Sequence, residues 1–180
     1  MCGISFYFSK DKAYEIELRK SLRVTSHRGP DSSGTYFKET KNGFLGLGHN
    51  RLSIIDLSSS GAQPMMTGDI RIIFNGEIYN YKEIRQDLIS RGYSFDTSTD
   101  TEVILNSYAE YGVDCFTLFR GMFTFVIVDE AKDRVFLVRD SLGIKPLYFY
   151  RSDDSLYACS EIKGLKVFPS SIIQKYNDDV

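Results

Sequence analysis

The sequence has no excess of charge of either sign and no long run of like charges. Its 22 lysines and arginines nearly balance 24 aspartates and glutamates, which leaves a formal net charge of −2. A surface that binds nucleic acid or an anionic membrane normally concentrates positive charge. We therefore expect neither nucleic acid nor a membrane as a partner.

Cysteines are few, and they lack the spacing of a metal site. Cys2, Cys115 and Cys159 are odd in number and form no Cys-x-x-Cys pair or Cys/His ligand pattern. This argues against a disulfide framework and a zinc site, and it fits a reducing compartment. Long apolar runs are also missing, because the stretch 6–8 is followed at once by charged residues and is too short for a signal peptide or a membrane span. We expect a cytoplasmic protein.

The first residues, Met1-Cys2-Gly3, suggest a chemical function. Initiator methionine is normally removed before a small residue, so the mature chain would begin with Cys2, whose thiol and free α-amine belong to one residue. Such an amine has a pKa of roughly 7.7 to 8 and can take the thiol proton. A thiol beside a base is a common covalent nucleophile. The alternative is a cysteine at position 2 by chance, and if Met1 is retained the base is lost.

Short apolar or alternating runs bounded by turn residues predict strands. The first, Gly3–Phe8, is apolar on both faces, so we expect it in the centre of a sheet, where it would hold Cys2 in place. Asn42-Gly43 is typical of a hairpin turn. The predicted strands are residues 3–8, 35–37, 43–50, 70–74, 122–129, 134–139, 147–150 and 155–160, with an extended stretch at 51–57 and loops at 26–34 and 58–64.

Helical periodicity predicts an amphipathic helix at Ala13–Val24 and another at Ile78–Arg91, ended by Gly92. Thr99 and Glu102 have the spacing of a capping box and open a third helix that runs to residue 112. A short helical turn is expected at 114–119 and no element at 168–180.

These elements predict an α+β fold in one domain. The chain of 180 residues is of single-domain size. Because most connections are too short for helical crossovers, the sheets should be mostly antiparallel. Sheet packed on sheet with helices outside is the expected layering.

Three polar positions are candidates for binding or catalysis. Asn75-Gly76, at the end of a predicted strand, could present a side-chain amide and a backbone N–H to one oxyanion, although the pair more often forms a plain turn before a helix. Arg51 could bind a carboxylate through two hydrogen bonds, or be a surface arginine. Asp100 could complement the dipole of the third helix, or receive an ammonium group.

The histidines and the other cysteines are weaker candidates. His27 and His49 would suit a cysteine–histidine pair, but a cysteine that carries its own amine needs no imidazole. Cys115 and Cys159 lie among apolar residues, so we expect inert core thiols.

Taken together, these features resemble the class II glutamine amidotransferase domain, an N-terminal-nucleophile hydrolase, and most closely the glutaminase half of the asparagine synthetase family. The resemblance runs from Met1 to about Leu165. The blocks that carry it, in the family's order, are residues 1–4 (MCGI), 27–31 (HRGPD), 48–56 (GHNRLSIID), 63–65 (QPM), 74–80 (FNGEIYN), 100–102 (DTE), 121–123 (GMF), 139–140 (RD), 143–148 (GIKPLY) and 160–163 (SEIK).

The resemblance implies a four-layer αββα sandwich of two mostly antiparallel sheets flanked by helices. It implies an amidotransferase domain at residues 1–165, with 166–180 as a tail or the start of a linker. The implied reaction is hydrolysis of L-glutamine to glutamate and ammonia through a Cys2 thioester. The implied catalytic residues are Cys2, Asn75 and Gly76, and the implied substrate-binding residues are Arg51, Leu52, Ile54, Glu77 and Asp100.

In these roles Arg51 would hold the α-carboxylate of glutamine, and Asp100 with Glu77 would hold its α-ammonium. No metal or cofactor is implied for the glutaminase step, and ATP and Mg²⁺ are implied only for a synthetase domain that this sequence does not contain. That domain, or a separate subunit, would accept the ammonia. The acceptor acid, aspartate or another, and a homodimer are left open. Two alternatives also remain: a glutamine-binding or regulatory module without turnover, and an N-terminal-nucleophile amidase that acts on another amide.

Overall fold

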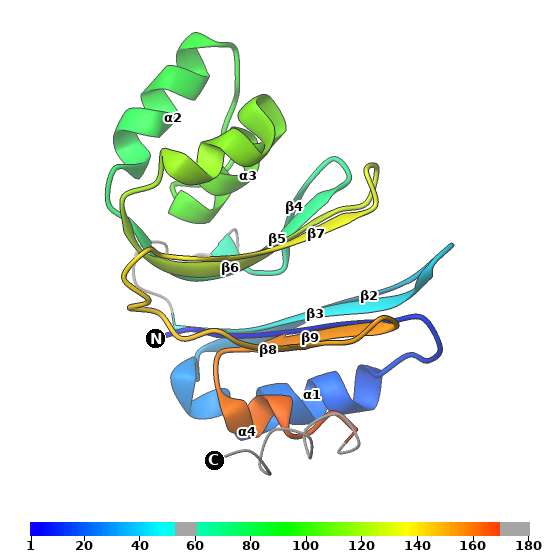
Figure 1. Ribbon diagram of the computed structural model, residues 1–180. Helices are drawn as coiled ribbons and strands as arrows, with labels where there is room; N and C mark the ends of the chain where they lie inside the picture. Colours follow the sequence, from blue (N-terminus) through cyan, green and yellow to red (C-terminus); the bar gives the residue numbers. More distant parts are fainter. Residues whose placement is uncertain (53–60, 170–180) are drawn as a thin grey trace. The chain divides into compact units, whose positions relative to one another are not determined.

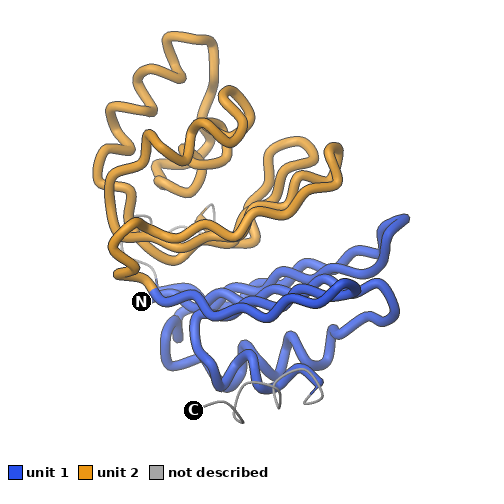
Figure 2. Tube along the Cα trace, viewed as in Figure 1, with its two compact units in different colours: residues 1–52, 146–180 blue, residues 53–145 orange. Residues whose placement is uncertain are grey.

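A computed structural model describes residues 1–52 and 61–169 (Figure 1). The chain divides into two compact units, one of residues 1–52 and 146–180 and the other of residues 53–145 (Figure 2). We call them unit 1 and unit 2. Each contains one sheet with helices on one face. The single domain expected from the chain length stays a prediction.

Unit 1 is built on a five-stranded sheet in the order β2-β3-β1-β9-β8. Every pairing in it is antiparallel, as predicted, and β1 lies in the centre, between β3 and β9. Helices α1 and α4 cover one face of this sheet (Figure 1). The elements are β1 (Gly3–Ser9), α1 (Glu15–Val24), β2 (Ser32–Thr40), β3 (Gly43–Arg51), β8 (Tyr148–Arg151), β9 (Ser155–Cys159), α4 (Ile162–Leu165) and a 3₁₀ turn (Ser26–Arg28).

Aromatic side chains fill the space between this sheet and its helices. Tyr7 of β1 and Tyr157 of β9 pack with Leu18 of α1 and with Phe168. The rings of Tyr157 and Phe168 lie 4.9 Å apart between centroids. The packed part of unit 1 therefore reaches Phe168, beyond the boundary expected at residue 165.

Unit 2 is built on a four-stranded antiparallel sheet in the order β4-β5-β6-β7. Its helices α2 and α3 lie together over one face (Figure 1). The elements are β4 (Met65–Thr67), β5 (Ile70–Ile78), α2 (Tyr81–Ser90), α3 (Asp100–Tyr111), a 3₁₀ helix (Gly112–Thr117), β6 (Gly121–Asp129) and β7 (Arg134–Arg139).

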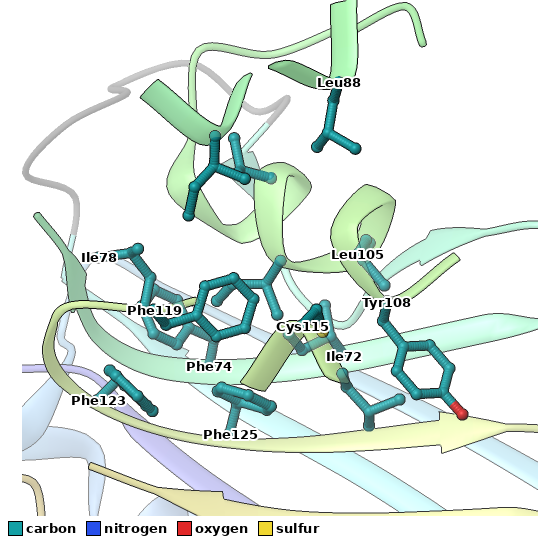
Figure 3. Close-up of a cluster of buried hydrophobic side chains, with 14 residues drawn as sticks. Ile72, Phe74, Ile78, Leu88, Leu105, Tyr108, Cys115, Phe119, Phe123 and Phe125 are labelled. Carbon is teal, nitrogen blue, oxygen red and sulfur yellow. The ribbon is translucent and has the colours of Figure 1, made fainter. Parts of the chain in front are cut away.

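The core of unit 2 lies between this sheet and its helices (Figure 3). Ile72 and Phe74 of β5 and Phe125 of β6 meet Leu88 of α2 and Leu105 of α3. Along β5, residues 72, 74 and 78 belong to this cluster, so the side chains at 73, 75 and 77 point to the opposite face. Asn75 is therefore directed away from the helices.

The predicted turn at Asn75-Gly76 is wrong. Strand β5 continues through both residues to Ile78, in register with β6, and α2 begins at Tyr81 rather than at Ile78. Local sequence favours a turn at Asn-Gly, but pairing with β6 overrides it. Gly76 permits that pairing, because a Cβ at this position would lie 2.3 Å from the carbonyl oxygen of Met122.

Other elements differ from the prediction mainly in extent. β2 begins at Ser32, inside the predicted loop 26–34, because residues 32–34 pair with 49–51 of β3. β4 and α4 were not predicted, since three and four residues are too few to show a period. The hairpin around Asn42-Gly43 is confirmed. Residues 53–60, which include most of the predicted extended stretch 51–57 and the start of the predicted loop 58–64, lie outside the described residues.

The start of α3 confirms one half of the predicted capping box. The Thr99 hydroxyl oxygen accepts a hydrogen bond from the Glu102 backbone N–H at 3.3 Å. The Glu102 carboxylate does not reach back to the Thr99 N–H, and it accepts instead from the backbone N–H groups of Asp96 and Thr97 at 2.8 and 2.7 Å. Glu102 thus fixes the chain that enters the helix, and with it the position of Asp100.

Replacement of Leu105 by alanine should destabilise the domain. Leu105 is fully buried in the core of unit 2, so Leu105→Ala is expected to lower the free energy of unfolding by about 2–5 kcal/mol. Chemical denaturation of both proteins measures this difference. Ile89→Ala, on the exposed surface of α2, is the matched control and should change stability by less than about 0.5 kcal/mol. Equal effects of the two substitutions would contradict the described core.

Candidate active site

The residues singled out from the sequence belong to both units, and each unit is described by itself. Ile54 lies outside the described residues. Unit 1 contains Cys2, Arg51 and Leu52. Unit 2 contains Asn75, Gly76, Glu77 and Asp100.

In unit 1, Cys2 is held at the point where β3 ends. Its sulfur lies 3.4 Å from the backbone nitrogen of Leu52, which donates to it, and 3.6 Å from the Leu52 carbonyl oxygen, which can accept the thiol proton. Gly3 pairs with Asn50, so the buried Arg51 is also close in the chain to this contact. The structure therefore brings Cys2 into contact with Leu52, and Arg51 is the neighbour of Leu52 in the chain.

Arg28 anchors the backbone of Cys2, a role that the sequence did not reveal. Its Nε donates to the Cys2 carbonyl oxygen at 2.9 Å, and its Nη1 donates to the Glu161 carboxylate at 3.1 Å. Its Nη2 is buried with no hydrogen-bond partner among the described residues. In the sequence, Arg28 had only its place in the block 27–31 that carries the family resemblance. In the structure, a Cβ on the adjoining Gly29 would lie 2.4 Å from the Asn50 carbonyl oxygen. Glycine thus lets the chain that carries Arg28 approach β3 closely.

Glu161 contacts two more side chains near this anchor. His27 Nε2 lies 2.9 Å and Lys163 Nζ 3.2 Å from its carboxylate. Burial raises the pKa of Glu161, but hydrogen bonds from Arg28, Lys163 and His27 outweigh it, so the pKa is lowered from its usual value. His27 is thus paired with an acid rather than with Cys2.

In unit 2, the edge of β5 beside Asn75 is completed by side chains. Alternate residues of a strand point their N–H groups to the same edge, and β4 pairs with β5 only as far as Ile72. Beyond it, the Phe74 N–H donates to Gln63 Oε1 at 2.6 Å, and the Ile78 N–H donates to Asp100 Oδ2 at 3.0 Å. The Gly76 N–H lies on this edge between them, where no described strand continues the ladder.

Asn75 places a second donor beside Gly76. Its side chain is only 1% exposed, yet its Nδ2 has no hydrogen-bond partner among the described residues. A buried donor without a partner costs about 1–3 kcal/mol, so such a group calls for an explanation. Two neighbouring donors of this kind can together stabilise an oxyanion.

Asp100 begins α3 and is 4% exposed. Burial raises the pKa of its carboxyl to about 6; its hydrogen bonds with backbone N–H groups, including that of Ile78, oppose the shift, and the charge of Glu77 adds to it. The structure therefore brings Asp100 and Glu77 within electrostatic reach of one another. A ligand cation would relieve their repulsion.

Neither a metal site nor a membrane-spanning helix is found in the described ranges. Within residues 1–52 and 61–169, no three His, Cys, Asp or Glu side chains are grouped so as to hold a metal ion. In the same ranges, no helix has the length and apolar character needed to cross a bilayer.

Comparison with known proteins identifies the family. A family profile described as a glutamine amidotransferase domain matches residues 1–178. The chain belongs to the glutamine amidotransferase domain family. Two similar proteins are asparagine synthetase (glutamine-hydrolysing) 1 of Bacillus subtilis, 43% identical over 96% of this chain, and asparagine synthetase B of Escherichia coli, 41% identical over 92%. The resemblance to the glutaminase half of asparagine synthetases is thereby confirmed.

This amidotransferase domain spans 28% and 30% of the lengths of those two relatives. Among solved structures, the glutamine phosphoribosylpyrophosphate amidotransferase of Bacillus subtilis matches with a TM-score of 0.78 and 21% identity, over 92% of this chain and 43% of that one. At this identity the match concerns the fold alone. The expected α+β N-terminal-nucleophile hydrolase fold, with two antiparallel sheets and helices, is confirmed.

The three thiols should differ in reactivity. Cys115 and Cys159 are fully buried, and burial raises the pKa of both, that of Cys115 to about 12. Cys2 is only partly buried. We expect iodoacetamide to alkylate Cys2 in the native protein and the other two only after denaturation, because the thiolate is the reactive form. Peptide mass spectrometry measures this, with Cys2→Ala as a control that should stay unmodified while folded; native alkylation of Cys115 or Cys159 would show that the core opens.

Proposed function

We propose that this domain hydrolyses L-glutamine to glutamate and ammonia through a thioester on Cys2. The observation that carries the proposal is the pair of neighbouring donors at Asn75 and Gly76, one of them buried without a partner, in a member of the glutamine amidotransferase family. The described residues supply no acceptor for the Asn75 amide. A tetrahedral oxyanion is an acceptor of this kind.

The reaction begins with the Cys2 thiol. After removal of Met1, the α-amine of Cys2 takes the thiol proton and the sulfur attacks the side-chain carbonyl carbon of glutamine, forming a C–S bond. The carbonyl oxygen becomes an oxyanion and accepts hydrogen bonds from Asn75 Nδ2 and the Gly76 N–H. The amine then gives its proton to the leaving nitrogen, the C–N bond breaks and ammonia departs. Water attacks the thioester in the same way, which releases glutamate and restores the thiol.

Charged residues select a free amino acid. Arg51 is proposed to bind the α-carboxylate of glutamine. Asp100, with the nearby charge of Glu77, is proposed to bind the α-ammonium. An amide that lacks these two charged groups would be a poor substrate. The substrate-binding roles of Leu52 and Ile54 remain predictions; the backbone of Leu52 contacts the Cys2 sulfur.

The ammonia is proposed to pass to a synthetase domain or subunit. The names of the two relatives favour aspartate as the acid that accepts it. ATP and Mg²⁺ would serve that synthetase step, whereas hydrolysis of glutamine by the groups above needs no metal or cofactor. Three unpaired cysteines support a cytoplasmic location. A homodimer stays a prediction.

Removal of the nucleophile tests the reaction. Cys2→Ala is expected to lower the rate of glutamate release from glutamine by more than about a thousandfold, since no other group can form the thioester. Cys115→Ala removes a thiol of the unit 2 core and should retain the rate at temperatures where it is folded. A Cys2→Ala protein with wild-type activity would refute the mechanism. A wild-type protein that binds glutamine without releasing glutamate would favour the binding module instead.

The acidity of Asp100 predicts how glutamine affinity depends on pH. The carboxylate binds an ammonium only when it is deprotonated, and the pKa is raised to about 6. Affinity should therefore be constant above pH 6 and be lost as the pH falls through 6, by about tenfold for each further unit. Calorimetric titration of the Cys2→Ala protein with glutamine between pH 5 and 8 measures this without turnover.

Two variants in the same Cys2→Ala background separate Asp100 from other groups. Asp100→Asn should bind glutamine about 10- to 100-fold more weakly at pH 7.5 and lose the dependence below pH 6, because it cannot become charged. Asp87→Asn removes a surface carboxyl of α2 and should leave the profile unchanged. A profile that Asp100→Asn does not alter would remove Asp100 from the ammonium site.

A further inference from the structure

Gln63 takes the place of a strand residue beside the proposed oxyanion donors. Backbone pairing of β4 with β5 stops at Met65 and Ile72. Two residues further along β5, the Phe74 N–H is met by the Gln63 side chain, whose Oε1 accepts it at 2.6 Å. The side-chain carboxamide thus continues the ladder where β4 has ended.

The other end of the same carboxamide contacts α3. Gln63 Nε2 donates to the Thr101 hydroxyl oxygen at 3.3 Å. Gln63 is 9% exposed and Thr101 is 3% exposed, so water competes little for either bond. One side chain therefore connects β5 to the first turn of α3.

Each residue that Gln63 contacts is a sequence neighbour of a proposed site residue. Phe74 precedes Asn75, and Thr101 follows Asp100. Asp100 in turn accepts from the Ile78 N–H. The segment from Asn75 to Glu77 is therefore held on its open edge at both ends, by Gln63 before it and by Asp100 after it.

The carboxamide is the group that these two neighbours require. The Phe74 N–H needs an acceptor, and the Thr101 oxygen needs a donor at a fixed distance from that acceptor. A carboxylate offers acceptors only, and an aliphatic side chain offers neither. A small displacement of a catalytic donor is costly, because misplacement by about 1 Å can reduce a rate by about a hundredfold.

We propose that Gln63 is a positioning residue for glutamine hydrolysis, which aligns the Asn75 and Gly76 donors with the Asp100 carboxylate. This inference rests on the proposed function. Gln63 itself touches neither the reacting atoms nor the nucleophile in this role; it acts through β5 on the rate and through α3 on substrate binding.

Two substitutions distinguish the effect of Gln63 on the rate from its effect on substrate binding. Thr101→Val keeps the shape of the residue and removes only the contact with Nε2, so it should raise KM for glutamine by about fivefold and change kcat by less than about twofold. Gln63→Met removes both contacts at nearly constant length and should raise KM similarly and lower kcat by about tenfold. Steady-state glutamate release measures both constants. Rates are normalised to the amount of Cys2 that a glutamine-analogue electrophile labels, so that unfolded protein is not counted.

The matched control is Tyr108→Phe, which removes another buried hydrogen bond of unit 2, between the Tyr108 hydroxyl and Asp129 at 2.9 Å. It should lower the melting temperature and leave kcat and KM unchanged. If Gln63→Met or Thr101→Val affects only the melting temperature, as this control does, Gln63 merely supports the fold and the inference is overturned. A wild-type protein that releases no glutamate would instead overturn the proposed function, and the positioning role with it.

Discussion

The pairing of β1 on both of its edges is the constraint on which the proposed nucleophile depends. The first residues of a chain normally fray. Here Gly3–Ser9 is hydrogen-bonded to β3 on one side and Ser5–Ser9 to β9 on the other, and Arg28 holds the carbonyl group of Cys2 itself. Conformational freedom at the start of the chain is thereby removed during folding rather than during each turnover. In the proposed mature form, which lacks Met1, this pairing and the Arg28 contact would order the residue that carries both nucleophile and base.

In unit 2, by contrast, the pairing of β4 with β5 stops at Ile72, before β5 ends. Had β4 continued along β5, its carbonyl groups would have taken the N–H groups of Phe74, Gly76 and Ile78. Side chains of Gln63 and Asp100 take the first and the last, so the edge is stabilised while the N–H of Gly76 stays directed outward. The Asn75 amide adds a buried donor at a cost to stability. Such a cost is typical of a site prepared for a charge that appears only during a reaction.

Much of the fold was open to prediction because its signals are local. The central strand β1, the hairpin at Asn42-Gly43 and the Thr99 cap follow from patterns of a few residues, and the structure confirms them. Where local and distant contacts disagree, prediction failed. Asn75-Gly76 favours a turn locally, and only the approach of β6 makes it part of a strand.

The residues of the candidate site also differ in whether a local signal or a distant contact reveals them. Cys2, Asn75 and Asp100 could be chosen from their chemistry and from the family resemblance. Arg28 and Gln63 also lie in blocks that carry the resemblance, but their roles could not be assigned, because each acts through a contact with a residue distant in sequence. A polar side chain that holds the backbone of another segment has no signature of its own in a single sequence. The unit to which each candidate belongs was likewise unpredictable, since unit 1 joins the two ends of the chain.

The place of β9 beside β1 also sets the order of events during synthesis. The paired residues Ser5 of β1 and Cys159 of β9 are roughly 150 residues apart in the sequence. Because a ribosome adds about 5–20 residues each second, β9 is synthesised roughly 8 to 30 seconds after β1. Throughout that interval the amino terminus of the nascent chain is not yet enclosed by its sheet. The removal of Met1 that the proposed mechanism requires would therefore act on an accessible end of the chain, and the thiol acquires its fixed position only when translation of the domain is nearly complete.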